Sequence, residues 1–284
     1  MKKLERPLKK IQAHDIYIEC ANAFTSKISI KENAIKYEKE VAILAQMYEE
    51  KGPQNIMGLT LPSLTDEECD DIIKLYDQKF SKLGEDTRKY YDAILANGGK
   101  ICPICGVGKR RTLDHFLPKS KYPLLCVTPL NLVPTCRDCN MEKGAKSSTD
   151  YYEMPFNPYF DDNSLAWLTC RIDFGINGEC IPQFYNGLDK TQDPGWFKKC
   201  EVHISNSKLD ETFQNAAVDE IENVQEHYWE LYKECGEDEV KKQLRSYQKS
   251  CERIDINSWR AALYSALSLQ YHEFCEWLKK TCKR

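Results

Sequence analysis

Hydrophobic and polar positions in the N-terminal region, residues 1–97, follow helical spacing. Between residues 30 and 50, apolar side chains fall near one face, and Lys and Glu residues fall opposite. The apolar positions are Ile35, Val41, Leu44 and Met47. This pattern predicts a helix over residues 30–50. The first 14 residues are basic without such a pattern, so we expect a frayed, solvated terminus there, with contact to nucleic acid as the alternative.

Two further helices are predicted before residue 98. Thr65 stands three positions before Glu68, which is the spacing of a capping box, where each side chain bonds the backbone N–H of the other residue. We therefore expect a helix over residues 66–82. A third helix, residues 85–97, is expected to end at the Gly-Gly pair at 98–99, because glycine commonly follows the last helical residue.

Residues 151–207 have a different pattern. They open with an aromatic, proline-containing segment that disfavours regular structure, and then predict two strands, residues 168–174 and 179–185. The Asn-Gly pair at 177–178 is the preferred pair for a type I′ turn, so a small β-hairpin is expected. The rest of this region is predicted to be loop, with one further strand at residues 200–204.

The C-terminal region, residues 208–284, returns to helical spacing. Two amphipathic helices are expected, residues 208–234 and 238–253, and Ser258 is expected to cap a last helix over residues 259–282. A stripe at roughly heptad spacing runs along that last helix and consists of Trp259, Leu263, Leu267, Phe274 and Trp277. Such a stripe is typical of a core or of a helix that contacts a partner chain.

Four of the fourteen cysteines stand in two Cys-x-x-Cys pairs near the middle of the chain. They are Cys102, Cys105, Cys136 and Cys139. Two such pairs supply the four thiolates of a tetrahedral Zn²⁺ site, and four protein ligands leave no open position, so the expected zinc ion is structural. The other cysteines are scattered singly, and the sequence shows neither a signal peptide nor an apolar run of about 20 residues. We therefore expect reduced thiols, a cytoplasmic location and no membrane contact.

The 30 residues between the two pairs carry most of the candidate chemistry. Asp114 offers the hard oxygen ligand that Mg²⁺ or Mn²⁺ prefers, and His115 can remove a proton from water near neutral pH. Asn140 offers a second oxygen from the first turn of a predicted helix, residues 137–146. If residues 112–115 form a strand, Asp114 and His115 point to opposite faces. The strand must then end or bulge for both side chains to reach one phosphate.

This order of residues resembles the HNH endonucleases, the ββα-metal or His-Me finger nuclease family, in their zinc-stapled form. The resemblance covers residues 98–150 and implies a ββα module embedded between mainly α-helical segments, and hence an α+β fold. It implies that His115 is the general base and that Asp114 and Asn140 hold one catalytic Mg²⁺ or Mn²⁺. It further implies that Asn131 orients the histidine loop and that the four cysteines bind the structural zinc.

The same module is a basic island in an acidic chain. Residues 98–148 contain nine Lys and Arg against three Asp and Glu, a net charge of +6, whereas the whole chain carries −4. A local basic patch is expected of a module that binds a phosphate backbone. The residues expected to bind nucleic acid are Lys109, Arg110, Arg111, Lys119, Lys121 and Lys143.

The resemblance implies metal-dependent hydrolysis of phosphodiester bonds, and we expect DNA as the substrate. The overall layout is also similar to that of HNH subunits that pair with an ATPase in bacterial antiphage systems such as Septu, which predicts an effector nuclease with an ATPase partner. Two alternatives stay open: a non-catalytic zinc module that binds nucleic acid, and a protein-interaction module whose zinc is structural. The nuclease prediction requires an imidazole and two side-chain oxygens to converge on one phosphate.

Overall fold

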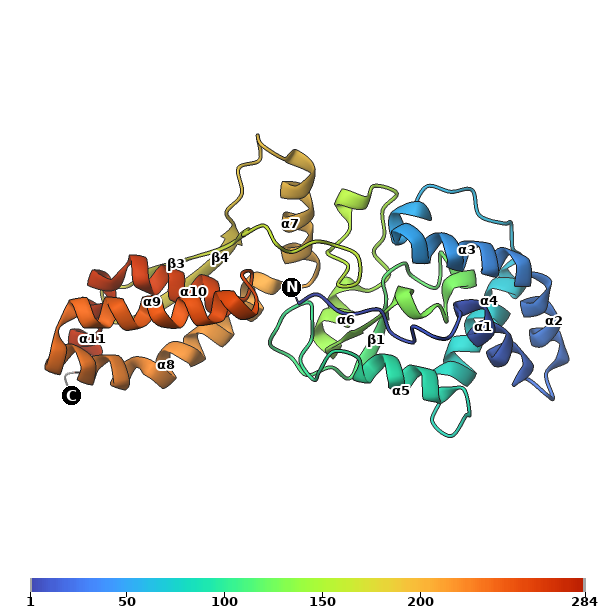
Figure 1. Cartoon of the computed structure of the whole chain (residues 1–284), viewed down its shortest axis with the longest axis horizontal. Coiled ribbons are helices and arrows are strands. Elements are labelled where there is room, and N and C mark those ends of the chain that lie inside the picture. Colours follow the sequence, from blue (N-terminus) through green and yellow to red (C-terminus); the bar gives the residue numbers. More distant parts are fainter. Residues whose placement is uncertain (1, 283–284) are drawn as a thin grey trace. The chain divides into compact units, whose positions relative to one another are not determined.

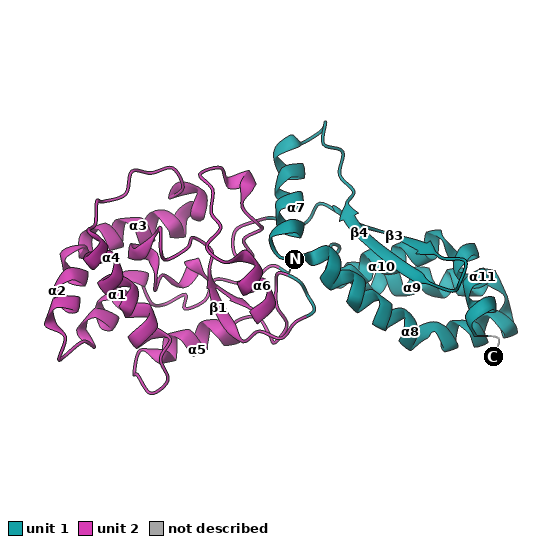
Figure 2. Ribbon diagram, turned by 180° about the vertical axis from the view of Figure 1, so that it is seen from behind, with its two compact units in different colours: residues 1–2, 105–107, 162–284 teal, residues 3–104, 108–161 magenta. Residues whose placement is uncertain are grey.

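The computed structural model describes residues 2–282, which form an α+β protein of helices and small antiparallel strand pairs (Figure 1). The chain divides into two compact units, coloured separately in Figure 2. Unit 2 contains residues 3–104 and 108–161, and unit 1 contains residues 105–107 and the chain from residue 162 onward. The expected regions 1–97 and 98–150 therefore share unit 2 almost entirely.

Unit 2 begins with helices that pack around one hydrophobic core. Their bounds are α1 (Ala13–Asn22), α2 (Ile28–Lys36), α3 (Glu38–Lys51), α4 (Asp66–Lys74), the π-helix η2 (Leu75–Phe80) and α5 (Arg88–Ala96). Three short 3₁₀ helices begin at a proline and span Pro53–Asn55, Pro123–Leu125 and Pro129–Asn131, and another spans Tyr151–Glu153. The core includes buried side chains from α1, α3 and the π-helix together with those of residues 113–133. The helical region therefore forms the wall against which the cysteine-flanked segment packs.

The predicted helix over residues 30–50 is wrong as a single element, because the chain leaves helical geometry at Tyr37. The break lets α2 pack on α4 while α3 packs on α1. Tyr37 also donates a hydrogen bond to Glu68, 2.8 Å away. A periodic pattern records which face is apolar but not that its two halves bury against different partners.

The expected frayed N-terminus is also wrong. Leu4 is buried and its N–H donates to Pro158 O at 2.8 Å, while the Arg6 guanidinium lies over the Phe160 ring. Helix α1 then buries Ile16 and other apolar residues. Leu4 and Pro7 therefore attach the start of the chain to unit 2, whereas its lysines stay exposed to solvent.

The capping box is confirmed: Glu68 N–H donates to Thr65 Oγ1, and Thr65 N–H donates to Glu68 Oε2. The helix continues through the π-turns to Phe80, close to the predicted end at residue 82. Helix α5 stops before Gly98 and Gly99, whose φ angles of 78° and 107° explain why glycine stands there.

A strand–strand–helix unit follows in unit 2. Its elements are β1 (Thr112–His115), β2 (Leu132–Thr135) and α6 (Arg137–Lys143). The two strands are antiparallel, with Leu113 opposite Pro134 and His115 opposite Leu132. Residues 112–115 do form the strand that the sequence analysis considered as a condition. Helix α6 begins where predicted but ends three residues earlier than residue 146.

Unit 1 combines a β-hairpin with helices. Its elements are β3 (Leu168–Phe174), β4 (Cys180–Asn186), α7 (Pro194–Asn206), α8 (Leu209–Cys235), α9 (Glu237–Ile254), α10 (Trp259–Leu269) and α11 (Tyr271–Thr281). The hairpin is confirmed, but its turn is not type I′. Gly175 N–H donates to Glu179 O, and Gly178 takes a positive φ of 96° while Asn177 does not. This is the geometry of a three-residue loop with a glycine in the left-handed position.

Two predicted elements of unit 1 are wrong. Residues 200–204 lie inside α7 rather than in a strand. This helix begins at Pro194, and Asp193 caps it by accepting a hydrogen bond from Trp196 N–H. The expected last helix is confirmed in its Ser258 cap but breaks at Gln270. The Gln270 side-chain amide bonds both the N–H and the carbonyl of Ile172, so it covers the free edge of β3.

The aromatic stripe of the last two helices is buried within unit 1, which confirms that it belongs to a core. No helix in residues 2–282 combines the length and the apolar character that crossing a membrane requires. The calls that extend to residues 283–284 lie outside the described residues at those two positions.

The capping box gives a test of this helical wall. Thr65→Ala removes the acceptor for Glu68 N–H and should lower the free energy of unfolding by about 1 kcal/mol. Urea unfolding followed by circular dichroism measures the change. Thr60→Ala, at an exposed loop position, is the matched control and should shift the midpoint little. Equal effects of the two changes would show that the cap is not stabilising.

Candidate functional site

The four predicted zinc ligands come together in the structure. The Sγ atoms of Cys102, Cys105, Cys136 and Cys139 all lie within 4.8 Å of one another, and all four residues are buried. Thiolates on a tetrahedral Zn²⁺ with Zn–S bonds of about 2.3 Å lie about 3.8 Å apart, so this cluster fits one such ion. None of the fourteen cysteines, which all fall within residues 2–282, forms a disulfide.

Backbone amides point at two of these sulfurs. Val107 N–H donates to Cys105 Sγ at 3.5 Å, and Cys139 N–H donates to Cys136 Sγ at 3.4 Å. N–H donors stabilise a thiolate over a thiol because they favour the charged form. Cys136 is also the N-cap of α6, so a metal held here fixes where that helix starts relative to the strands.

Side chains satisfy the backbone carbonyls that the two-stranded ladder leaves unpaired. The Tyr76 hydroxyl donates to Leu113 O at 3.3 Å, and the Tyr159 hydroxyl donates to Leu132 O at 3.0 Å. The Lys143 ammonium donates to His115 O at 2.6 Å. Because a buried carbonyl without a partner costs free energy, these donors from three other segments anchor the ladder in unit 2.

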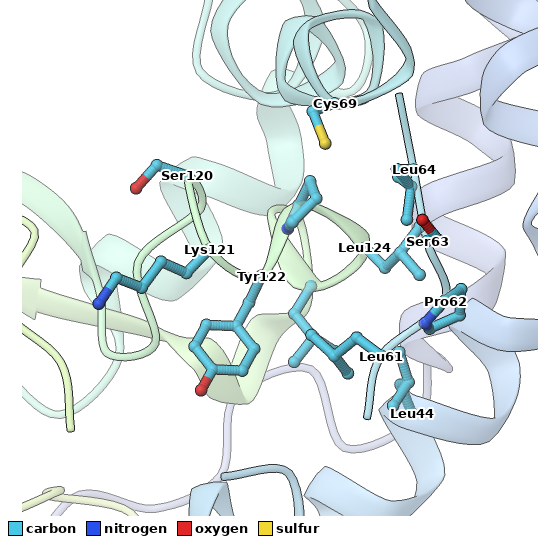
Figure 3. Close-up of a pocket in the computed structure, with 12 residues that line it drawn as sticks. Leu44, Leu61, Pro62, Ser63, Leu64, Cys69, Ser120, Lys121, Tyr122 and Leu124 are labelled. Carbon is cyan, nitrogen blue, oxygen red and sulfur yellow. The ribbon is translucent and has the colours of Figure 1, made fainter. Parts of the chain in front are cut away.

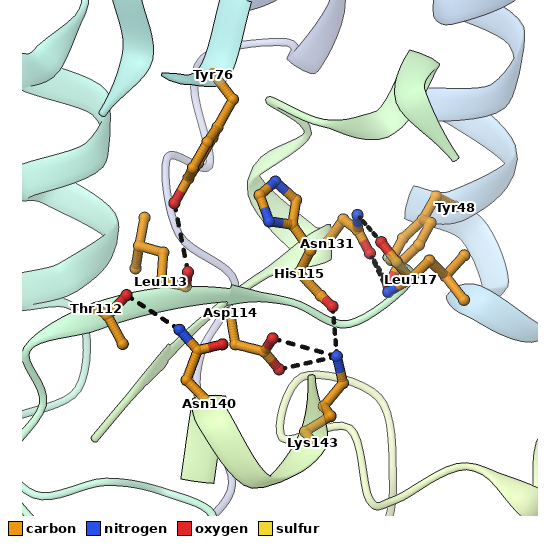
Figure 4. A network of polar contacts seen from close by, with 10 residues as sticks. All are labelled: Tyr48, Tyr76, Thr112, Leu113, Asp114, His115, Leu117, Asn131, Asn140 and Lys143. Carbon is orange, nitrogen blue, oxygen red and sulfur yellow. Dashed lines mark hydrogen bonds and ion pairs between the residues drawn. The ribbon is translucent and has the colours of Figure 1, made fainter. Parts of the chain in front are cut away.

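Asp114 and Lys143 form a buried ion pair on the α6 side of β1 (Figure 4). The Lys143 Nζ lies 3.2 Å from Oδ1 and 3.1 Å from Oδ2 of Asp114, and the two side chains are 6% and 9% exposed. Burial raises the pKa of the Asp114 carboxyl to about 6, while the charge of Lys143 acts in the opposite direction. The carboxylate is therefore ionised near neutral pH and paired with a cation of the chain itself.

Asn140 lies beside this pair, one helical turn before Lys143. Its Nδ2 donates to Thr112 Oγ1 at 3.3 Å, and in Figure 4 its amide oxygen points toward the Asp114 carboxylate. The structure thus brings Asp114, Asn140 and Lys143 together on one face of β1.

His115 lies on the opposite face of the same strand. Its Nε2–H donates to Cys126 O at 2.8 Å, and its ring packs edge-on against Tyr76 with the ring centres 4.4 Å apart. Since a carbonyl only accepts, the proton is on Nε2 and the lone pair is on Nδ1. Burial lowers the pKa of His115 to about 3, so the imidazole is neutral. Figure 4 shows the ring pointing away from the carboxylate of Asp114.

The expected convergence of His115 with Asp114 and Asn140 is therefore not present in this conformation. The ladder pairs both strand residues in regular register, so neighbouring side chains alternate between faces without a bulge. A divalent cation also does not fit on Asp114 as the site stands, because both carboxylate oxygens hold the Lys143 ammonium. Cation binding requires Lys143 to leave Asp114, and convergence with His115 requires the end of β1 to change course.

Asn131 is fully buried and uses its whole hydrogen-bonding capacity. Its Oδ1 accepts from Leu117 N–H at 2.8 Å and from the Tyr48 hydroxyl at 3.2 Å. Its Nδ2 donates to Leu117 O at 3.0 Å and to Leu125 O at 3.3 Å. The amide thus fixes both ends of the loop between His115 and β2, in keeping with the orienting role that the resemblance implies.

Sequence reasoning missed Tyr48 and Tyr76 as parts of this site. Tyr48 reaches Asn131 from α3, and Tyr76 contacts both Leu113 and His115 from the π-helix. Helical spacing marks Tyr48 as a core position, but nothing in the sequence indicates which buried amide its hydroxyl meets.

The six basic residues expected at the surface separate into different environments. Arg110 is buried, and its guanidinium donates to the backbone carbonyls of Asn97, Gly98 and Ile101. Lys143 is buried as described, and Lys119 pairs with Asp77. Lys109, Arg111 and Lys121 are exposed. Arg110 and Lys143 are therefore not part of an exposed basic rim in this conformation.

Unit 2 also contains an open pocket of about 240 Å³, and one of the segments that line it follows β1 in the sequence (Figure 3). Its walls are mainly apolar and come from α3, the loop at residues 61–64 and the loop at residues 120–125. None of the predicted catalytic residues lines it. The pocket therefore does not replace the Asp114 face as the candidate site.

Fold and site together define an α+β protein with a four-cysteine cluster suited to zinc. No protein-family model matches the chain, and no solved structure matches it. Protein ea31 of Escherichia phage lambda is 33% identical over 195 residues, which cover 63% of this chain and 64% of ea31. Septu protein PtuB of Bacillus thuringiensis is 40% identical over 77 residues, which cover 25% of this chain and 29% of PtuB. The chain thus spans less than two thirds of either relative.

The Asn131 network predicts a graded loss of stability. Asn131→Ala removes a hydrogen-bond partner from each of four buried polar groups and should cost about 3 kcal/mol or more. Tyr48→Phe removes one of those bonds and should cost about 1 kcal/mol. Both are measured by urea unfolding. A loss for Asn131→Ala no larger than that for Tyr48→Phe would contradict the network.

The cysteine cluster predicts zinc-dependent folding. Cys102→Ser should reduce the bound zinc well below one ion per chain and lower unfolding free energy by about 3 kcal/mol or more, because metal binding contributes directly to folding. Elemental analysis and thermal melting measure both quantities. Cys235→Ser, at an exposed cysteine outside the cluster, is the control and should leave zinc content unchanged. An unchanged zinc content in Cys102→Ser would contradict the assignment of a zinc site to the four cysteines.

Proposed function

We propose that the chain is a zinc-stabilised endonuclease of HNH type that hydrolyses phosphodiester bonds, with DNA as its substrate, in antiphage defence. In this proposal zinc is structural, and the described conformation is a resting one. A divalent cation such as Mg²⁺ or Mn²⁺ would supply charge stabilisation of the scissile phosphate when bound.

The observation that carries the proposal is the polar cluster on one face of the strand–strand–helix unit. Asp114 comes from β1, whereas Asn140 and Lys143 come from the helix that begins at a cysteine of the zinc-type cluster. Negative, neutral and positive polar groups side by side on a rigid unit suit the binding of a charged phosphodiester group. Exposed Lys109 and Arg111 near the same strand are suited to the flanking phosphates.

His115 is the proposed general base, and its role sets a requirement. The neutral ring carries its lone pair on Nδ1, as a base must, but it lies on the face away from Asp114. Catalysis therefore requires the chain to bend or bulge at the end of β1, so that the ring and Asp114 reach one phosphate. The bond from Nε2–H to Cys126 O leaves Nδ1 available and can stay in place. Asn131 holds the loop that follows His115 through its bonds to the backbone of Leu117.

The similarity to a Septu protein supports the defence role in this proposal. It agrees with the layout resemblance to HNH subunits of such systems, and it extends the proposal to an ATP-binding partner protein. A chain that cleaves nucleic acid fully by itself would remove the partner from the proposal.

A second function is favoured by the burial of His115. A zinc-stabilised module that binds nucleic acid or protein without cleaving it needs no base, and its histidine can stay bonded to Cys126. Cleavage assays separate the two functions directly.

The assay uses supercoiled plasmid, single-stranded DNA and RNA, each with Mg²⁺ or Mn²⁺ and with EDTA. The parent chain should cut DNA in the presence of the added cation, and His115→Ala should lower the rate by about 100-fold or more because the base is lost. His227→Ala, an exposed histidine of α8, should cut like the parent. A parent that cuts none of the three substrates, or a His115→Ala variant as fast as the parent, would favour the non-catalytic function.

A further inference from the structure

The Lys143 ammonium occupies a site lined by oxygen atoms of Asp114 and His115, called the Asp114 seat below. The ammonium has three N–H donors, and these meet both Asp114 carboxylate oxygens and the His115 carbonyl oxygen. The amide oxygen of Asn140 points toward the same carboxylate in Figure 4. Carboxylate, carbonyl and amide oxygens are the ligand types that hard divalent cations take. A cation site is therefore built here, and the chain fills it with its own side chain.

An ammonium and a divalent cation exclude each other at this seat. Both need the same two carboxylate oxygens, and two positive charges a few ångströms apart repel strongly in a buried site. Lys143 is nevertheless able to leave, because it is the last residue of α6, directly before Gly144, and its charge is carried on a flexible four-carbon stem.

We propose that Lys143 is an exchangeable cation that couples metal binding to phosphate binding at the Asp114 seat. Without nucleic acid, the ammonium holds the seat and keeps divalent cations out. A phosphate of the nucleic-acid backbone offers the ammonium a new anionic partner, and the vacated carboxylate then accepts the metal. This inference rests on the proposed function for the identity of the phosphate. It adds to the nucleic-acid contact expected of Lys143 a second, positioning role, which is to control the access of metal to Asp114.

The first test measures Mn²⁺ binding by electron paramagnetic resonance, without any cleavage. Zinc-loaded parent chain should bind Mn²⁺ weakly. Lys143→Gln keeps a hydrogen-bond donor but removes the charge, and should bind Mn²⁺ at least about 10-fold more tightly. Lys146→Gln makes the same charge change at an exposed position three residues away and should match the parent. Asp114→Asn, combined with Lys143→Gln, should abolish the gain.

The second test takes its main result from the parent chain, so that result does not depend on the folding of any variant. Addition of a duplex DNA oligonucleotide with non-hydrolysable phosphate linkages should tighten Mn²⁺ binding by the parent. The same addition should have little effect on Lys143→Gln, whose seat is already free of charge. Zinc content and circular dichroism verify the fold of each variant.

Three results would overturn the inference: parent and Lys143→Gln within about twofold in Mn²⁺ affinity, a gain that survives loss of Asp114, or no effect of DNA on the parent. These outcomes are independent of catalysis. Tighter Mn²⁺ binding in Lys143→Gln without any cleavage by the parent would retain the cation exchange and remove the nuclease function. Cleavage by the parent, together with equal Mn²⁺ affinities of parent and Lys143→Gln, would retain the nuclease function and remove the cation exchange.

Discussion

A carboxylate buried inside a protein needs a compensating cation, and Asp114 sets this constraint for the whole site. The cation is Lys143, at the end of α6. Its ammonium ties that helix to β1 because it contacts both the Asp114 carboxylate and the backbone carbonyl of His115. Loss of either partner would leave the other charge buried and uncompensated. The relative placement of strand and helix, and with it the position of Asn140, depends on this pair.

The two other anchors of the unit are of different kinds. The cysteine cluster fixes the start of α6 and the loop before β1, so a bound metal defines the two ends of the segment. Asn131 fixes its middle, through bonds that reach as far as Tyr48 of α3. The N-terminal helices are thus a structural part of the site rather than a separate module, because the amide that shapes the loop is partly satisfied from them.

The sequence carries information on local structure and on residue types that must meet. The capping box at Thr65, the hairpin and the four-cysteine cluster were all predictable because each has a short-range signature. The breaks at Tyr37 and Gln270 were not, because they arise when one helical pattern packs on two different partners. The helix at residues 194–206 was missed because Pro-Gly, which stands at 194–195, is typical of turns, although Asp-Pro also begins helices.

The candidate site shows the same division. The identity and order of the candidate site residues favoured the interpretation as a nuclease. The alternation of side chains along a strand already indicated that Asp114 and His115 point apart. Neither the partner that holds His115 nor the ion pair that occupies Asp114 has a signature in the sequence, because Cys126 and Lys143 reach them only in the folded chain.

Anomalous X-ray diffraction from crystals of the zinc-loaded chain, grown with Mn²⁺ and a non-hydrolysable DNA oligonucleotide, tests the central claim most directly. The account predicts a zinc peak among the four cysteines, a manganese peak at the Asp114 carboxylate, and the Lys143 ammonium moved onto a phosphate. A zinc peak alone, with Lys143 still bonded to Asp114 and DNA bound elsewhere, would contradict it.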